Sequence, residues 1–274
     1  MANQMTGVVM SKTTINCITA WLALIGALAL GGGCAGTSEE VLQRSQAQFR
    51  LAATMHNEGS NRAAVIQHLQ NALEIDPENA RAYLLLGVVL VERGNLRAGI
   101  PEIERSVTLF EEQGPGAALA EARNVLGATL LHAGRLEEAA EVLESSAEDL
   151  LNTSPHLALG NLGLVYFQQD RLGEARQALR ESVQQQERFC LGYFRLGMVL
   201  FADDEFELAE QALTRAVSAD PSCEAFQDAY KLRGEVYARL ELSVEAVEDM
   251  ETCLELGPRT DSGRFCARFL EGIR

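Results

Sequence analysis

Six cysteines are the residues of this 274-residue chain with the most direct chemistry. Four of them lie in the second half of the sequence, at Cys190, Cys223, Cys253 and Cys266. An even number of thiols in an oxidising compartment predicts two disulfides, with three possible connectivities. The alternative is a set of buried free thiols, because cysteine often fills small-residue positions in a core. The sequence has no CxxC motif and no nearby histidine pair, which argues against a metal site.

The other polar residues form no motif that points to catalysis. The sequence contains no phosphate-binding loop, no HExxH and no GxSxG. Its four histidines are isolated, which is typical of surface or packing residues: His56, His68, His132 and His156. The net charge of −16 disfavours nucleic acid as a partner, because phosphate backbones repel an acidic surface. We therefore expect no enzymatic activity, no cofactor, no metal and no small-molecule substrate.

The two remaining cysteines lie in an N-terminal segment that resembles an export signal. Residues 1–33 contain one charged side chain, Lys12, and an apolar run at residues 17–30. This run is shorter than the ~20 residues of a membrane-spanning helix and matches a secretory signal peptide. The true start of the chain could be Met1 or Met10.

Cys34 follows three glycines and resembles the acylated cysteine of bacterial lipoproteins. On this interpretation residues 34–45 comprise the lipidated cysteine and a tether, and Ala35 favours sorting to the periplasmic face of the outer membrane. The motif is imperfect, because Gly31 stands where such proteins usually have leucine. The alternative is ordinary cleavage near residues 27–29, which would release a soluble periplasmic protein.

The elements that carry the other residues repeat with a period of ~34 residues. Four Leu-Gly pairs each begin the same spacing of large and small residues: Leu86-Gly87, Leu126-Gly127, Leu162-Gly163 and Leu196-Gly197. The small residues allow two helices to approach closely, and the large ones fill the space between helical hairpins. Gly94 and Gly134 permit tight turns within two of the hairpins.

This spacing resembles the tetratricopeptide repeat (TPR), a pair of antiparallel helices. The resemblance implies an all-α TPR solenoid of about six helix-turn-helix repeats, followed by a capping helix at residues 261–274. The expected repeats are 46–79, 80–113, 120–153, 156–189, 190–223 and 227–260. In the sixth repeat Arg233 replaces the leucine of the motif.

The expected hairpins favour one of the three disulfide connectivities. Cys190 opens the fifth repeat and Cys223 closes it, and an antiparallel hairpin brings its two ends together. Cys253 lies on the second helix of the sixth repeat, and Cys266 lies on the helix that should pack against it. We therefore predict the disulfides Cys190–Cys223 and Cys253–Cys266.

In TPR arrays the first helix of each repeat lines the inner surface, and here those helices present an apolar strip. The predicted partner-binding groove consists of Leu84, Val88, Val91, Asn124, Leu131, Leu164, Phe167, Leu191, Phe194, Met198 and Phe201. Exposed apolar patches usually mark interaction sites; the alternative is that these are ordinary core residues. An apolar groove suits a hydrophobic strand or an amphipathic helix better than a charged peptide tail.

An exported, lipid-anchored chain of six TPRs resembles the type IV pilus pilotins, the PilF/PilW/Tgl-like family. The stretches at residues 161–166, 188–197 and 263–270 carry the closest similarity. The resemblance implies an outer-membrane lipoprotein whose partner is a secretin subunit, and which helps secretins assemble into the ring through which the pilus passes. The alternative function is a general periplasmic TPR scaffold or adaptor for cell-wall or outer-membrane assembly enzymes.

Overall fold

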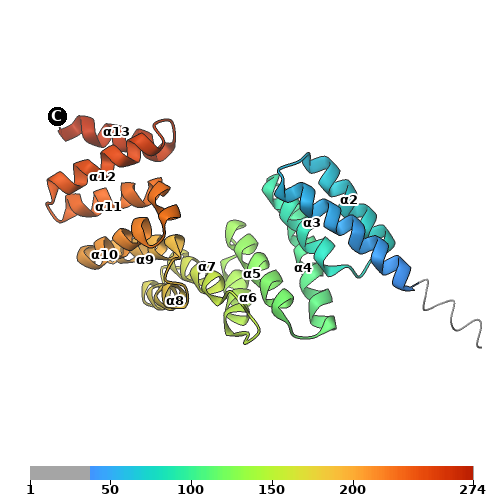
Figure 1. The fold of residues 1–274 in the computed structure, drawn as a ribbon. Helices are drawn as coiled ribbons and strands as arrows, with labels where there is room; N and C mark the ends of the chain where they lie inside the picture. Colours follow the sequence, from blue (N-terminus) through green and yellow to red (C-terminus); the bar gives the residue numbers. More distant parts are fainter. Residues whose placement is uncertain (1–37, 274) are drawn as a thin grey trace, which may run out of the picture. The chain divides into compact units, whose positions relative to one another are not determined.

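A computed structural model describes residues 38–273, and within that range the chain is helical and contains no strand (Figure 1). The all-α fold expected from the sequence is therefore confirmed. None of the helices in this range has the length and hydropathy needed to cross a membrane. The predicted signal peptide at residues 1–33 and the predicted lipidation site Cys34 lie outside the described residues. The chain divides into two compact units, one ending at Ala82 and one beginning at Tyr83.

The first unit contains α1 (residues 38–57), α2 (Arg62–Ile75) and the start of α3 (Ala80–Glu92). Because α1 begins at residue 38, residues 38–45 of the predicted tether are helical. Within α1, Ser45 is fully buried, and its hydroxyl donates a hydrogen bond to the carbonyl oxygen of Ala72 at 2.8 Å. Asn79 in turn donates to the Ser45 hydroxyl at 2.9 Å. These bonds connect α1 to α2 and to the residues that follow α2.

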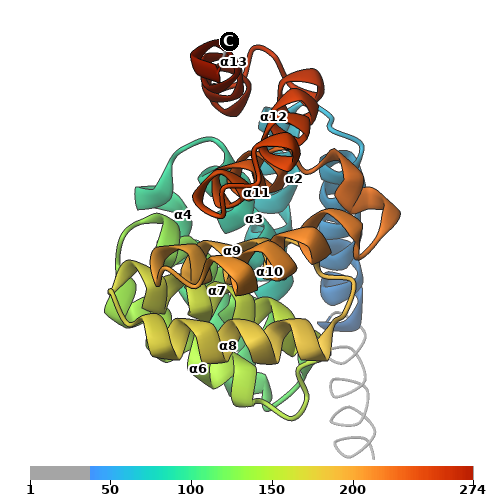
Figure 2. The ribbon, with the colours of Figure 1, turned by 90° about the vertical axis from the view of Figure 1, so that its left-hand side faces the viewer.

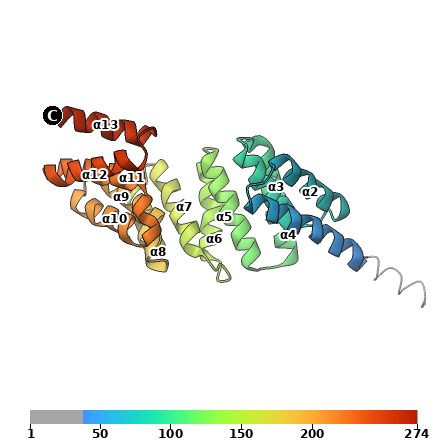
Figure 3. The same ribbon diagram turned by 45° about the horizontal axis from the view of Figure 1, so that its top comes forward.

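The second unit continues α3 as a succession of helical hairpins (Figures 1 and 2). Its further helices are α4 (Leu96–Gln113), α5 (Ala117–His132), α6 (Leu136–Glu148), α7 (Pro155–Gln168), α8 (Leu172–Gln185), α9 (Cys190–Ala202), α10 (Phe206–Ser218), α11 (Gln227–Arg239), α12 (Ser243–Leu256) and α13 (Asp261–Ile273). A short 3₁₀ helix, η1 (Pro221–Ala225), connects α10 to α11. From α5 to α12, the odd-numbered helix of each pair packs on the even-numbered one that follows it. Each even-numbered helix from α4 to α10 also packs on the first helix of the next pair (Figure 3).

The glycine of each Leu-Gly pair lies where the two helices of a hairpin are in closest contact. A Cβ atom on Gly163 would lie 2.4 Å from Leu179, and one on Gly197 would lie 2.6 Å from Leu213. Both leucines are fully buried, so neither can move aside without disturbing the core. The periodic glycines therefore mark the sites where α7 meets α8 and α9 meets α10.

The turns inside the hairpins contain residues with a left-handed backbone. Gly94 and Gly134 have φ angles of 77° and 74°, which glycine adopts at little cost. In the later turns the corresponding residues are Asp170, Asp204 and Glu241, with φ angles of 60°, 56° and 62°. Glutamate is the least suited of these to that conformation, because its side chain makes no short local hydrogen bond that compensates.

The exceptional Arg233 of the last repeat has a dedicated partner. Its guanidinium donates two hydrogen bonds to the carboxylate of Asp249 on α12, at 2.7 and 2.8 Å. Asp249 is only 5% exposed, and Arg233 also donates to Thr214 of α10 at 3.1 Å. Burial alone would lower the pKa of Arg233, but the hydrogen bonds to Asp249 raise that pKa above its ordinary value. A buried ion pair thus occupies two positions that are both apolar in three of the four repeats with a Leu-Gly pair.

Candidate protein-binding face

Both predicted disulfides are present in the second unit. Cys190 at the start of α9 is bonded to Cys223 of η1, with 5.7 Å between the Cα atoms. Cys253 of α12 is bonded to Cys266 of α13, with 6.3 Å between the Cα atoms. Among residues 38–273 there is no group of three or more histidine, cysteine or acidic residues arranged to hold a metal ion.

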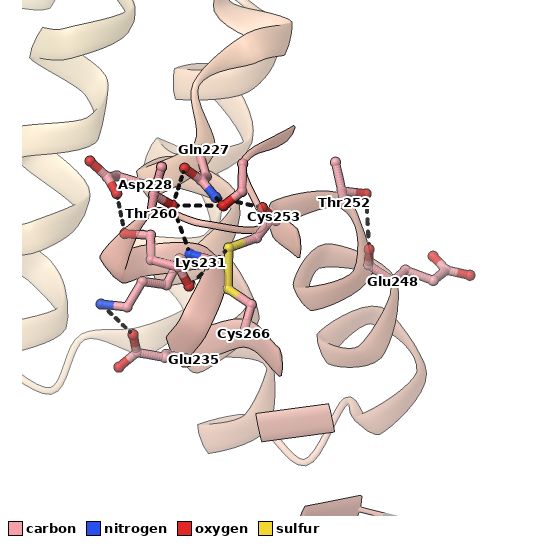
Figure 4. Close-up of a disulfide and its surroundings, with 12 residues drawn as sticks. Gln227, Asp228, Lys231, Glu235, Glu248, Thr252, Cys253, Thr260 and Cys266 are labelled. Carbon is pink, nitrogen blue, oxygen red and sulfur yellow. Dashed lines mark hydrogen bonds and ion pairs between the residues drawn. A yellow bond between two sulfur atoms is a disulfide. The ribbon is translucent and has the colours of Figure 1, made fainter. Parts of the chain in front are cut away.

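A network of hydrogen bonds between α11 and the residues that connect α12 to α13 lies beside the second disulfide (Figure 4). The side-chain amide of Gln227 donates to the carbonyl oxygens of Cys253 and Gly257, at 2.7 and 3.0 Å. The hydroxyl of Thr260 donates to the Gln227 side-chain oxygen at 2.9 Å. The disulfide therefore joins α12 to α13, and the hydrogen bonds of Gln227 connect α11 to α12 and to the turn before α13.

The predicted groove residues lie partly in the core and partly at the surface. Nine are half-buried, in the order of the sequence Leu84, Val88, Val91, Asn124, Leu164, Phe167, Phe194, Met198 and Phe201. Leu191 is 38% exposed, and most of the apolar half-buried side chains pack against the core with one side. Leu131 belongs to the core instead, because it lies among the buried residues that fill the space between α5 and its neighbours.

Two of the predicted phenylalanines have aromatic neighbours that cover them. The ring of Phe194 lies 4.8 Å from that of Phe226, which precedes α11. The ring of Phe201 lies 5.7 Å from that of Phe206, and the guanidinium of Arg239 sits over it at 5.5 Å. Phe201 therefore closes the corner between α9, α10 and α11 and contributes less free surface than the sequence suggested.

A polar ladder of Asn124, Asn161 and Arg195 runs across the first helices of three successive repeats, α5, α7 and α9. The side-chain amide nitrogen of Asn161 donates to the side-chain oxygen of Asn124 at 3.1 Å. Nη1 of Arg195 donates to the side-chain oxygen of Asn161 at 2.9 Å. Because α7 also packs on both α5 and α9, these bonds tie together the faces of three helices.

The chemistry of Arg195 fixes the direction of this polar ladder. A guanidinium has donors but no acceptor, so Asn161 must turn its oxygen toward Arg195 and its nitrogen toward Asn124. Asn124 must then turn its oxygen toward Asn161, which leaves its own amide nitrogen facing away. The free groups at both ends of the polar ladder are therefore hydrogen-bond donors.

Apolar side chains flank the polar ladder on the same helix faces. Leu157 is 37% exposed and lies four residues before Asn161 on α7, and Leu191 lies four residues before Arg195 on α9. Residues four apart share one side of a helix. The candidate binding face thus combines the hydrogen-bond donors of the polar ladder with exposed apolar side chains beside them.

Of the polar ladder, sequence reasoning selected Asn124 and missed Asn161 and Arg195. The missed residues lie one helical turn from groove residues that were selected, since Asn161 is three before Leu164 and Arg195 is three before Met198. That spacing was a usable signal, but apart from Asn124 the predicted groove was defined by apolar side chains.

A shallow pocket with a volume of about 510 Å³ opens beside the first disulfide. Phe189, Leu191 and Phe226 contribute apolar walls, and Cys190 and Cys223 lie between them. Leu191 therefore belongs both to this pocket and to the helix face that carries the polar ladder.

Family models described as tetratricopeptide repeats match the chain at residues 60–94, 78–150, 157–188 and 194–259. No curated protein matches the sequence. Solved structures with a similar fold include PilF of Pseudomonas aeruginosa, with 21% identity and a TM-score of 0.68 over 85% of this chain and 99% of PilF. PilW, described as a widely conserved type IV pilus biogenesis factor, has 17% identity and a TM-score of 0.71 over 81% of this chain and 98% of PilW.

Other solved structures show that the same fold serves varied proteins. The Cut9–Hcn1 heterotetramer of the APC/C matches 86% of this chain but only 45% of the matched chain, with 15% identity and a TM-score of 0.68. Identities this low establish a shared fold and leave function open. Repeat models match the chain between residues 60 and 259, and the helical hairpins of the structure agree with them. The chain therefore belongs to the tetratricopeptide-repeat proteins.

Proposed function

We propose that this TPR protein acts as a pilotin, binding a secretin subunit and assisting the assembly of secretins for type IV pili. The TPR fold is a scaffold for protein interactions, and the described residues include no candidate metal centre. The observation that carries the proposal is the extent of the structural match. The solved chains of PilF and PilW are matched over 99% and 98% of their lengths, so the correspondence extends beyond one shared stretch of repeats.

Two further features support an exported protein. The N-terminal residues combine an apolar run with a cysteine after small residues, as in lipoproteins. The two disulfides suit an oxidising compartment such as the periplasm, since disulfides are rare in the cytosol. We propose that acylated Cys34 anchors the protein to the periplasmic face of the outer membrane and that the repeats remain free to bind.

The experiment that tests the proposal is an affinity purification from detergent-solubilised envelope, with identification of the captured proteins. We expect a secretin subunit to be recovered, and secretin multimers to be lost from a deletion strain. Cell-wall or outer-membrane assembly enzymes without any secretin would contradict the proposal and support a general periplasmic adaptor.

The variant Cys34→Ala separates anchoring from binding. We expect this variant to leave the outer-membrane fraction while still binding the secretin in vitro, because Cys34 precedes the repeats. A matched control is Cys17→Ala, since residue 17 lies within the predicted signal peptide and is absent after cleavage. Unchanged membrane association of Cys34→Ala would contradict the lipid anchor.

A further inference from the structure

Arg195 differs from the other half-buried arginines of residues 83–273. Those arginines each have a carboxylate partner: Arg123, Arg135, Arg176 and Arg233. For Arg195 the structure gives a single hydrogen bond, to the neutral side chain of Asn161, and no ion pair. This is unexpected in a chain with 39 acidic and 23 basic residues, where a carboxylate partner is easy to supply.

Partial burial of Arg195 raises the free energy of its unpaired charge. Burial lowers the pKa of Arg195 to about 10, so the side chain is partly desolvated yet still charged at neutral pH. Its remaining N–H groups are not sealed in the core, because none of them is among the fully buried atoms without a partner. A half-buried cation with accessible donors is suited to gain an anionic partner that folding does not provide.

The rest of the polar ladder narrows the chemistry of that partner. The outward amide nitrogen of Asn124 and the free N–H groups of Arg195 are all donors, so a matching ligand presents oxygen acceptors. Carboxylate and peptide carbonyl oxygens meet this requirement, and guanidinium and carboxylate pair through two parallel hydrogen bonds.

Apolar side chains lie on both sides of Arg195 along α9. Leu191 lies one turn before it and is exposed, and Met198 lies one turn after it and is half-buried. A chain that contacts both must pass over Arg195 and continue, so the carboxylate belongs to a side chain within the segment and not to a chain end.

We propose that the polar ladder binds an extended segment of the partner protein in which an aspartate or glutamate, flanked by apolar residues, pairs with Arg195. This inference rests on the proposed protein-binding function and gives the bound segment its chemistry. The proposal adds one specific cation to the predicted groove, whose residues are apolar apart from Asn124.

The test starts from a library of random 12-residue peptides displayed with their C-termini fused to a carrier, so that only side chains supply carboxylates. We expect the selected peptides to share an acidic residue between apolar ones. Affinity is then measured by fluorescence polarisation on the free peptides. Replacing the acidic residue by its amide, or Arg195 by glutamine, should weaken binding by about tenfold to a hundredfold, as expected for a charge-assisted hydrogen bond.

Asn161→Asp is a second variant that guards against a trivial loss of fold. The new carboxylate would lie where the Asn161 oxygen now lies, 2.9 Å from Arg195 Nη1, and would pair with the guanidinium internally. We expect it to weaken peptide binding as Arg195→Gln does while the melting temperature stays the same or rises. The matched control is Arg180→Gln on the exposed surface of α8, which should leave binding unchanged.

The inference is overturned if no peptide is selected, if the selected peptides lack an acidic residue, or if both variants bind them normally. Binding that depends only on a free C-terminal carboxylate would also overturn it. The proposed function fails separately, when wild-type protein captures no secretin from the envelope. Secretin capture that survives Arg195→Gln refutes the inference and leaves the proposed function standing.

Discussion

Removing the carboxylate of Asp249 should destabilise the C-terminal repeats more than most single substitutions do. Asp249→Ala leaves the guanidinium of Arg233 buried without its two hydrogen bonds of 2.7 and 2.8 Å. Breaking one side of a buried ion pair costs about 3–5 kcal/mol, because the remaining charge keeps its desolvation penalty. For a protein of this size each kcal/mol corresponds to about 2–4 °C, so we expect the melting temperature to fall by about 6–20 °C.

The other repeats suggest how to restore that stability. Arg233 and Asp249 are 16 residues apart, and the same spacing from Leu162 and Leu196 leads to Ala178 and Ala212. Arg233→Leu combined with Asp249→Ala therefore recreates an apolar pair that this fold already uses. We expect the double variant to lie within about 1 kcal/mol of the wild type, or above it, because apolar replacement of buried ion pairs is often neutral or stabilising.

Circular dichroism melts measure the global effect, and hydrogen exchange over α10–α12 locates it. The control is Asp261→Ala, which breaks the exposed pair with Arg264 and should change stability by less than about 1 kcal/mol. The reasoning is refuted if Asp249→Ala costs no more than this control. It is also refuted if the double variant is as unstable as the single one.

Three other perturbations test separate parts of the structure. Replacing both cysteines of Cys253–Cys266 by alanine should lower the free energy of unfolding by about 3 kcal/mol, and replacing both of Cys190–Cys223 should lower it by about 4 kcal/mol. The second loss is larger because that bond closes a loop of 33 residues and the first closes one of 13; thermal melts of the two double variants check the order. Glu241→Gly should stabilise the protein by about 1 kcal/mol in denaturant titrations, because φ is 62° at this turn, whereas Glu248→Gly inside α12 should destabilise it by a similar amount. Burial lowers the pKa of His156 below its ordinary value of 6.5. The neutral ring therefore stabilises the fold above pH 6.5, and this contribution is lost as the pH falls through the lowered pKa. In thermal melts between pH 7 and 5, the melting temperature of His156→Gln should change less with pH than that of the wild type.

The fold could be predicted from the sequence because the contacts between the two helices of a hairpin leave the same residue pattern in each repeat along the chain. The Leu-Gly pairs mark the close approach of two helices in one hairpin, as at Gly163 against Leu179. The Cys190–Cys223 bond was also accessible, since an antiparallel hairpin fixes where its ends meet. The helical conformation of residues 38–45 was not predicted, because Ser45 is polar and its burial beside Ala72 depends on the packing of α1 against α2.

The candidate binding face could be predicted only in part from the sequence, for a related reason. Asn161 is bonded to residues 37 positions before it and 34 positions after it, so the polar ladder exists only once three repeats are stacked. Leu131 was placed in the groove because helical projection gives a direction and not the depth of the neighbouring residues. Phe201 likewise acquires its cover from Arg239 of the next repeat.

The two disulfides also set how far this chain can be drawn out under mechanical load. A stretched polypeptide spans about 3.4 Å per residue, so the 33 residues between Cys190 and Cys223 would otherwise extend by about 110 Å, and the 13 between Cys253 and Cys266 by about 45 Å. With the bonds intact, each of these segments is bypassed by a Cα–Cα link of 5.7 or 6.3 Å. Tension between the N-terminus and a partner bound near α13 would therefore be carried by the two disulfide bonds. The chain would lengthen only in the segments outside the two disulfide-closed loops.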